Sequence, residues 1–210
     1  MAGTFLFAGL GNPGASYAQH RHNVGFMAVD RIAQAHGFGP WRSRFHGHVC
    51  EGQLQDHKIL LLKPTTYMND SGQAVGEAAR FLKVPREQVV VLHDDLDLAP
   101  GKIKVKLGGG DAGHNGLRSI TAVLGAGYKR VRIGIGHPGS PERVHGYVLH
   151  DFAKTDQEWL DPLLDAIANA APLLVEGDDT GFLNRIALAT KPQRPKTTPK
   201  PPAPETQNGI

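Results

Sequence analysis

Two ionisable residues, His22 and Asp94, could form the base of a hydrolytic site. Asp94 follows the β-branched run at residues 88–92, and His22 lies just before a helix predicted to start near Asn23. A carboxylate can hold a neutral imidazole in one tautomer and stabilise the imidazolium that forms when the ring takes a proton from water. Alternatively, His22 caps the following helix and Asp94 caps a turn, and the spacing alone leaves both interpretations open.

Three asparagines, Asn12, Asn69 and Asn115, each lie at or just beyond the end of a predicted strand or a glycine-rich loop. Amide groups at such positions can donate hydrogen bonds to a developing oxyanion or bind peptide groups in both directions. Asparagine is also an ordinary turn and cap residue, so the three could equally be without chemistry. They are candidates because the carboxyl ends of strands in an open α/β sheet are where ligands bind.

Basic residues alternate with apolar residues on two predicted strands. Lys104 and Lys106 share one strand, and Arg130 and Arg132 share the other. Residues two apart on a strand project from the same face. Four cations on two strands therefore predict a local patch for phosphates, although a solvated strand face is the alternative for either pair.

The glycines of residues 9–14 fit G-x-G-x-x-G, the fingerprint of a dinucleotide-binding turn, but their surroundings do not. Such a turn needs a helix that begins within the glycines, whereas Pro13 lacks an N–H group and residues 15–22 precede any predicted helix. Asp30 falls inside that helix, not at the end of a second strand. We therefore do not predict a nucleotide site.

The glycine-rich run at residues 108–116 is a candidate lid with the triple glycine as its hinge.

Water is the predicted nucleophile. The sequence has no G-x-S-x-G motif. Cys50 has no predicted helix N-terminus or cationic residue beside it that would activate its thiol as a nucleophile. Metal ligands could come from the H-x-H pairs at residues 20–22 and 46–48, or from the acidic stretch at residues 93–97. The first pair lies in a predicted loop and the second on a predicted surface strand, so we expect no metal and no other cofactor.

Composition indicates an ordinary folded chain with a distinct C-terminal segment. Of its 210 residues, 40% are hydrophobic, and the net charge of +3 resides in residues 191–210. The basic pI is therefore no evidence that the folded part binds nucleic acid. Cys50 is the single cysteine, and the sequence has neither a basic leader nor a run of about 18 apolar residues. We expect a cytoplasmic protein without membrane segments.

The hydrophobic pattern alternates between strands and helices. Strands are predicted at residues 5–8, 46–54, 58–63, 88–92, 102–107 and 129–135, and helices at residues 23–36, 71–82, 115–124, 156–175 and 180–190. Because hairpins occur among the β–α alternations, we predict an α/β fold with a mixed sheet in a single domain, residues 1–190. Residues 191–210 are rich in Pro and Lys without an apolar period and are predicted to be a disordered tail.

Five segments, in this order along the chain, resemble the motifs of bacterial-type peptidyl-tRNA hydrolases. They are GLGNPGASYAQHRHNVG, KPTTYMNDSG, HDDLDL, GKIKVKLGGGDAGHNGLRS and RVRIGIGHPG, and the resemblance covers about residues 5–190. It implies a monomeric, metal-free hydrolase with a twisted mixed sheet flanked by helices, phosphorylase/hydrolase-like in fold. The implied reaction cleaves the ester between a peptide and the 3′ acceptor end of tRNA, which recycles tRNA from peptidyl-tRNA released prematurely by ribosomes.

The resemblance also implies roles for individual residues. It makes His22 the base, Asp94 its partner, and Asn69 the residue that orients substrate and water and stabilises the intermediate. The substrate-binding and lid positions it implies are Asn12, Tyr17, Tyr67, Met68, Asn69, His114 and Asn115, and the tRNA phosphate-binding positions are Lys104, Lys106 and Arg132. The family spares free aminoacyl-tRNA, which implies that the amides read the acylated nitrogen.

Two positions depart from the family pattern, and two other function classes stay open. Asp95 stands where glutamate is common, and Pro141 occupies a loop position that can be basic in relatives. A non-enzymatic RNA-binding relative could keep the basic strands while losing His22, Asn69 or Asp94, but all three are present. A metallohydrolase would lose activity to chelators. The tail could add weak attraction to RNA that vanishes with salt.

Overall fold

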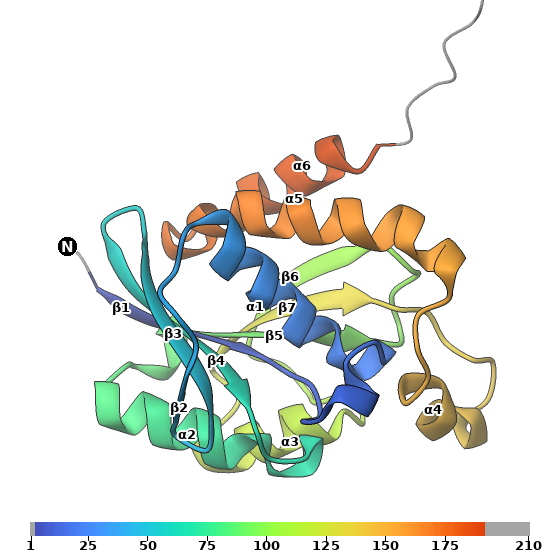
Figure 1. Cartoon of the computed structure of the whole chain (residues 1–210), viewed down its shortest axis with the longest axis horizontal. Helices are drawn as coiled ribbons and strands as arrows, with labels where there is room; N and C mark the ends of the chain where they lie inside the picture. Colours follow the sequence, from blue (N-terminus) through green and yellow to red (C-terminus); the bar gives the residue numbers. More distant parts are fainter. Residues whose placement is uncertain (1–2, 192–210) are drawn as a thin grey trace, which may run out of the picture.

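A single mixed β-sheet organises the computed structural model, which describes residues 3–191; the predicted disordered tail lies outside the described residues from position 192 onward. Within the described range, seven strands run in the order β2-β3-β4-β1-β5-β7-β6 (Figure 1). They are β1 (Thr4–Gly9), β2 (Arg42–Arg44), β3 (Gly47–Leu54), β4 (His57–Pro64), β5 (Val89–Asp95), β6 (Ile103–Leu107) and β7 (Lys129–Gly134). The predicted α/β class with a mixed sheet is confirmed.

Six α-helices and five short 3₁₀ helices complete the described part of the chain. The α-helices are α1 (Val24–Ala35), α2 (Ser71–Leu82), α3 (Asn115–Leu124), α4 (Pro141–Val148), α5 (Gln157–Val175) and α6 (Asp179–Ala189). The 3₁₀ helices are η1 (Ala15–Tyr17), η2 (Arg21–Asn23), η3 (Met68–Asp70), η4 (Arg86–Gln88) and η5 (Lys154–Asp156). Across residues 3–191, no helix has both the length and the apolar character needed to cross a membrane.

The sheet carries a hydrophobic core on each face, because successive side chains of a strand point to opposite sides. On β1, Phe5 and Phe7 pack in one core with α1 and α5, whereas Leu6 and Ala8 pack in the other with α2 and α3. Figure 1 shows α1, α5 and α6 on one side of the sheet and α2 and α3 on the other. This double cover explains why β5 reads as an uninterrupted apolar run before its polar end.

Two glycines bring the start of α1 against the ends of the central strands β1 and β5, which run parallel. A Cβ atom at Gly9 would lie 2.3 Å from the carbonyl oxygen of Gly25, and one at Gly25 would lie 2.3 Å from that of Leu92. Only glycine permits such close backbone packing at both positions. As a result η2, which carries His22 and directly precedes α1, contacts β5, which carries Asp94 near its end.

The observed elements differ from the predicted ones at three places. β5 continues to Asp95, so Asp94 lies within the strand instead of after it. The short edge strand β2 and the helix α4 were not predicted. The loop assignment of Pro141 is wrong, because this residue begins α4. Ser140 ahead of it, proline at the first position and Glu142 in the first turn together form a helix-start signal that was overlooked.

Candidate active site

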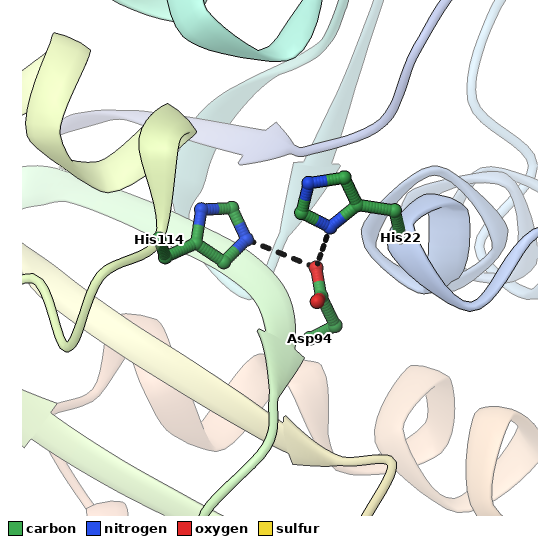
Figure 2. Close-up of side chains that lie close together, drawn as sticks. All are labelled: His22, Asp94 and His114. Carbon is green, nitrogen blue, oxygen red and sulfur yellow. Dashed lines mark hydrogen bonds and ion pairs between the residues drawn. The ribbon is translucent and has the colours of Figure 1, made fainter. Parts of the chain in front are cut away.

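Asp94 lies at the centre of a hydrogen-bonded cluster with two histidines, the Asp94 cluster. Its Oδ1 atom is 2.8 Å from Nδ1 of His22 and 2.9 Å from Nε2 of His114 (Figure 2). The three residues come from β5, from η2 and from the N-cap of α3. The structure thus brings the candidate pair His22 and Asp94 together and adds His114, a partner of Asp94 that sequence reasoning missed.

The cap of helix α3 determines the tautomer of His114. Its Nδ1 atom accepts hydrogen bonds from the backbone N–H groups of Gly116 and Leu117, at 3.1 and 3.4 Å. A ring nitrogen that accepts from N–H groups carries no proton, so the proton of a neutral His114 is on Nε2, which donates to Asp94.

The same carboxylate oxygen sets the tautomer of His22. An ionised carboxylate only accepts hydrogen bonds, so the Nδ1 atom of His22 donates to Asp94 and the Nε2 atom keeps a lone pair. Figure 2 shows that second ring nitrogen directed away from Asp94. An imidazole held in this way can accept a proton while its carboxylate partner stabilises the resulting charge.

Burial and charge act in opposite directions on these groups. Burial lowers the pKa of the His22 imidazole, but the charge of Asp94 and the hydrogen bond to it raise this pKa above its ordinary value. Burial raises the pKa of Asp94, yet His22 and His114 hold it well below its usual range. Burial, with the neighbouring His114, lowers the pKa of His93 to about 4. At neutral pH Asp94 is therefore ionised and His93 is neutral.

Spatially, the Asp94 cluster is also the kind of group that could hold a metal ion. Its hydrogen bonds oppose that use, because ligation through Nε2 of His114 would require the proton on Nδ1, the atom that caps α3. Of the four H-x-H histidines, only His22 belongs to a potential ligand group among residues 3–191, and that group is the Asp94 cluster itself. His20 lies 3.8 Å from Asp151, and His46 lies 3.2 Å from Glu77.

A cleft of about 730 Å³ contains the Asp94 cluster. The sequence-predicted residues that line it are Asn12, Tyr17, His22, Tyr67, Met68, Asn69, Asp94, His114 and Asn115. Much of the remaining wall is apolar and comes from the unpredicted helix α4 and its end, including Val144, Val148 and Leu149. A concave, partly apolar cleft with a few converging polar groups suits a peptide-sized ligand.

The three asparagines of this cleft are engaged differently. Oδ1 of Asn12 accepts the backbone N–H group of Met68 at 2.8 Å, and Oδ1 of Asn115 accepts from Arg118 at 3.3 Å. These contacts use the amide oxygens, so each amide N–H group is the part that can donate to a bound molecule. Asn69 lies in η3 with an exposed side chain.

The predicted patch of four cations is divided by the structure. Lys104 and Lys106 are exposed on the edge strand β6. Arg132 is partly buried, and its Nε atom donates to Asp95 at 2.7 Å. The assignment of Arg130 to an exposed patch is wrong, because its side chain is 2% exposed. β7 is an inner strand, and the glycine-rich segment passes over Arg130 and accepts its hydrogen bond.

Comparisons with known proteins agree with one another. A family model described as peptidyl-tRNA hydrolase matches residues 6–195. Peptidyl-tRNA hydrolase of Ruegeria pomeroyi is 62% identical over 199 residues, which are 94% of this chain and 83% of that protein. The corresponding protein of Bradyrhizobium diazoefficiens is 61% identical over 184 residues, or 88% and 92% of the two chains. A crystal structure of peptidyl-tRNA hydrolase from Acinetobacter baumannii superposes with a TM-score of 0.82 at 43% identity, covering 87% of this chain and 94% of that one.

Proposed function

Because this chain belongs to the peptidyl-tRNA hydrolase family, its reaction is the hydrolysis of peptidyl-tRNA, and we propose that His22 activates the attacking water. The observation that carries this proposal is the 2.8 Å hydrogen bond between His22 and the buried Asp94. It leaves the Nε2 atom of His22 as a proton acceptor at the cleft. A general base in such a position contributes about 10²–10⁴ to the rate.

The reaction then proceeds through a tetrahedral intermediate. Water attacks the ester carbonyl carbon between peptide and ribose as Nε2 of His22 takes its proton, and Asp94 stabilises the imidazolium. The carbonyl oxygen becomes an oxyanion, to which the side-chain amide of Asn69 donates. Collapse of the intermediate breaks the bond to the ribose oxygen, which receives the proton from His22. The products are a peptide carboxylic acid and a tRNA with a free terminal hydroxyl.

The amides of the cleft can account for the choice of an acylated substrate. The free N–H groups of Asn12 and Asn115 donate to carbonyl oxygens of the peptide. An acylated α-nitrogen carries such a carbonyl group, whereas the free amino group of an aminoacyl-tRNA does not. A free α-ammonium group would bring only donors against these donors, which disfavours it. Tyr17, Tyr67 and Met68 supply contact surface for the peptide side chains.

Exposed cations of β6 position the tRNA in this proposal. Lys104 and Lys106 bind acceptor-end phosphates, and Arg132 contributes the guanidinium N–H groups that Asp95 does not use. Binding of remote phosphates holds the ester at His22. The catalytic domain, residues 1–190, acts as a monomer that rescues tRNA from peptidyl-tRNA released by ribosomes, and residues 191–210 add weak RNA attraction.

Release of N-acetyl-aminoacyl groups from tRNA tests the proposal, with EDTA present throughout. The wild type and a His57→Ala control should be active, since His57 lies at the β3–β4 hairpin, where it accepts the N–H group of Gly3. His22→Ala should be inactive although it still binds tRNA. Equal activity of His22→Ala and wild type would exclude this base, and a wild type that is inactive in EDTA but active in a parallel assay without it would favour a metallohydrolase.

A further inference from the structure

We propose that Arg130 is a positioning residue, which acts on the reaction by holding the turn that presents His114 to Asp94. This inference rests on the proposed roles of His22 and Asp94. Arg130 is a cation with 2% side-chain exposure beneath the glycine-rich segment, and nothing in the proposed mechanism uses it directly. Its Nη1 atom donates to the carbonyl oxygen of Gly110, and its Nη2 atom lies 3.4 Å from Oδ1 of Asp111.

The burial of this guanidinium is costly for stability. Within residues 3–191 its Nε and Nη2 atoms have no hydrogen-bond partner, although Asp111 supplies an opposite charge and the ring of Tyr128 lies 4.5 Å from the guanidinium carbon. A buried and incompletely hydrogen-bonded cation is weak evidence for a stabilising role. Departures of this kind from good core design are typical of functional regions.

Asp111 links Arg130 to the Asp94 cluster. Its side chain is shared between Arg130 and the hydroxyl of Thr121 on α3, which donates at 2.8 Å. Its backbone carbonyl oxygen accepts the N–H group of His114, also at 2.8 Å. Asp111 is therefore fixed to β7 and to α3 by its side chain while its backbone closes the turn that ends at His114.

The backbone of this segment cannot hold that geometry without such anchors. Gly108, Gly109 and Gly113 have positive φ angles of 72°, 108° and 76°, and the non-glycine residue Ala112 has one of 47°. Glycines lose the most conformational freedom on folding, and a left-handed alanine is disfavoured. Without Arg130 the turn would sample other conformations, and His114 would spend less time at 2.9 Å from Asp94.

Substitution of Arg130 should therefore lower kcat through His114. His114 positions the Asp94 carboxylate, and a misplacement of about 1 Å that starts away from the reacting atoms can cost 10²-fold in rate. We expect Arg130→Met to lower kcat by about tenfold to a hundredfold with little change in KM, and Arg130→Lys to restore only part of the rate, because an ammonium lacks the fork that reaches both Gly110 and Asp111.

A double-mutant cycle with His114 gives the decisive readout. If Arg130 acts through His114, then Arg130→Met should change kcat less than about twofold in a His114→Ala background. The matched control is Lys129→Met, which removes another ion pair of β7, the 2.5 Å contact with Asp179 on α6. It should lower the thermal midpoint without lowering kcat, which separates lost stability from lost positioning.

Asp111→Asn keeps the cycle informative should Arg130→Met fail to fold, because Asp111 is partly exposed. It should show the same loss in kcat and the same dependence on His114. Equal losses with and without His114, or a rise in KM together with a weaker salt dependence of tRNA binding, would overturn the positioning role. A His22→Ala variant that kept full activity would instead overturn the proposed base.

Discussion

The Asp94 cluster and the edge strand β6 act on the same substrate in the proposed function, yet they are built in opposite ways. The Asp94 side chain is 2% exposed and is held by histidines from two separate elements. Lys104 and Lys106 project from an edge strand and are exposed to solvent. The proposed function thus assigns the chemistry to a buried carboxylate with two hydrogen bonds, and the docking of tRNA to exposed charges.

This difference predicts how each region should respond to change. Inside the protein, hydrogen bonds to a charge are strong, and a group that loses its partner stays desolvated, so the penalty is large. Exposed charges interact weakly and are screened by salt. Substitutions in the Asp94 cluster should therefore lower kcat, whereas substitutions on β6 should raise KM in a salt-dependent manner.

Asp94→Asn should have the largest effect and lower kcat by about 10²–10⁴-fold with a small change in KM. An asparagine amide can donate to Nδ1 of His22, which moves the proton to Nε2 and removes the base, and it cannot stabilise an imidazolium. Single-turnover hydrolysis of N-acetyl-aminoacyl-tRNA measures the step. Asp178→Asn is the matched control, since Asp178 caps α6 and asparagine caps equally well. A rise in KM without a decrease in kcat would contradict the assignment of the chemistry to the Asp94 cluster and of docking to β6.

Asn69→Ala should follow, with a decrease in kcat of about 10²–10³-fold, if its amide donates to the oxyanion. Asn69→Asp tests the reason, because it keeps the shape but replaces the donor with an acceptor and should be no more active than alanine. Asn184→Ala, on the exposed side of α6, is the control. Should Asn69→Asp retain wild-type kcat, the oxyanion role would be untenable.

The pKa of His22 should change in a defined direction when Asp94 is replaced. In the wild type it is raised above its ordinary value by the charge and hydrogen bond of Asp94, against the effect of burial. Activity should therefore fall as the pH decreases through this raised pKa, because the base becomes protonated. In Asp94→Asn burial remains without the charge, so the pKa should drop. Histidine NMR titration measures both proteins, and an unchanged pKa would mean that Asp94 does not control the base.

Local signals were sufficient to predict most of the fold and the position of the site. The apolar periods gave β1, β5 and the long helices to within three residues, because those elements are buried on one or both faces. His22 and Asp94 could be paired because Asp94 follows a predicted strand and His22 precedes a predicted helix, and such positions meet at the carboxyl ends of parallel strands.

What could not be predicted depends on contacts between distant segments. Arg130 and Arg132 look alike in sequence, but one is covered by the glycine-rich segment and the other reaches Asp95. The double contact of Asp94 is equally hidden, because His114 is placed by a turn that α3 and β7 stabilise together. Alternation on a strand identifies a shared face but not whether a later segment lies over it.

Lys104→Ala addresses the exposed region and should raise KM several-fold with little change in kcat. Loss of one phosphate contact should also reduce the slope of log affinity against log salt concentration by about one. Lys58→Ala, which removes an exposed lysine of β4, is the control and should change neither quantity. A decrease confined to kcat would assign Lys104 to the chemistry and remove the distinction between the two regions.

Removal of the residues after Thr190 should have the smallest effect. The tail adds three net positive charges to a chain that is otherwise neutral. These charges are screened by salt, so their removal should lower the affinity for tRNA only at low salt. Since no tail charge is part of the Asp94 cluster in this proposal, kcat should stay unchanged. A full-length variant with Gln at Lys191, Arg194, Lys196 and Lys200 should reproduce the truncation, because the effect arises from charge and not from chain length. Unchanged low-salt affinity in both variants would confine tRNA docking to the folded part, with β6 as its main source of charge.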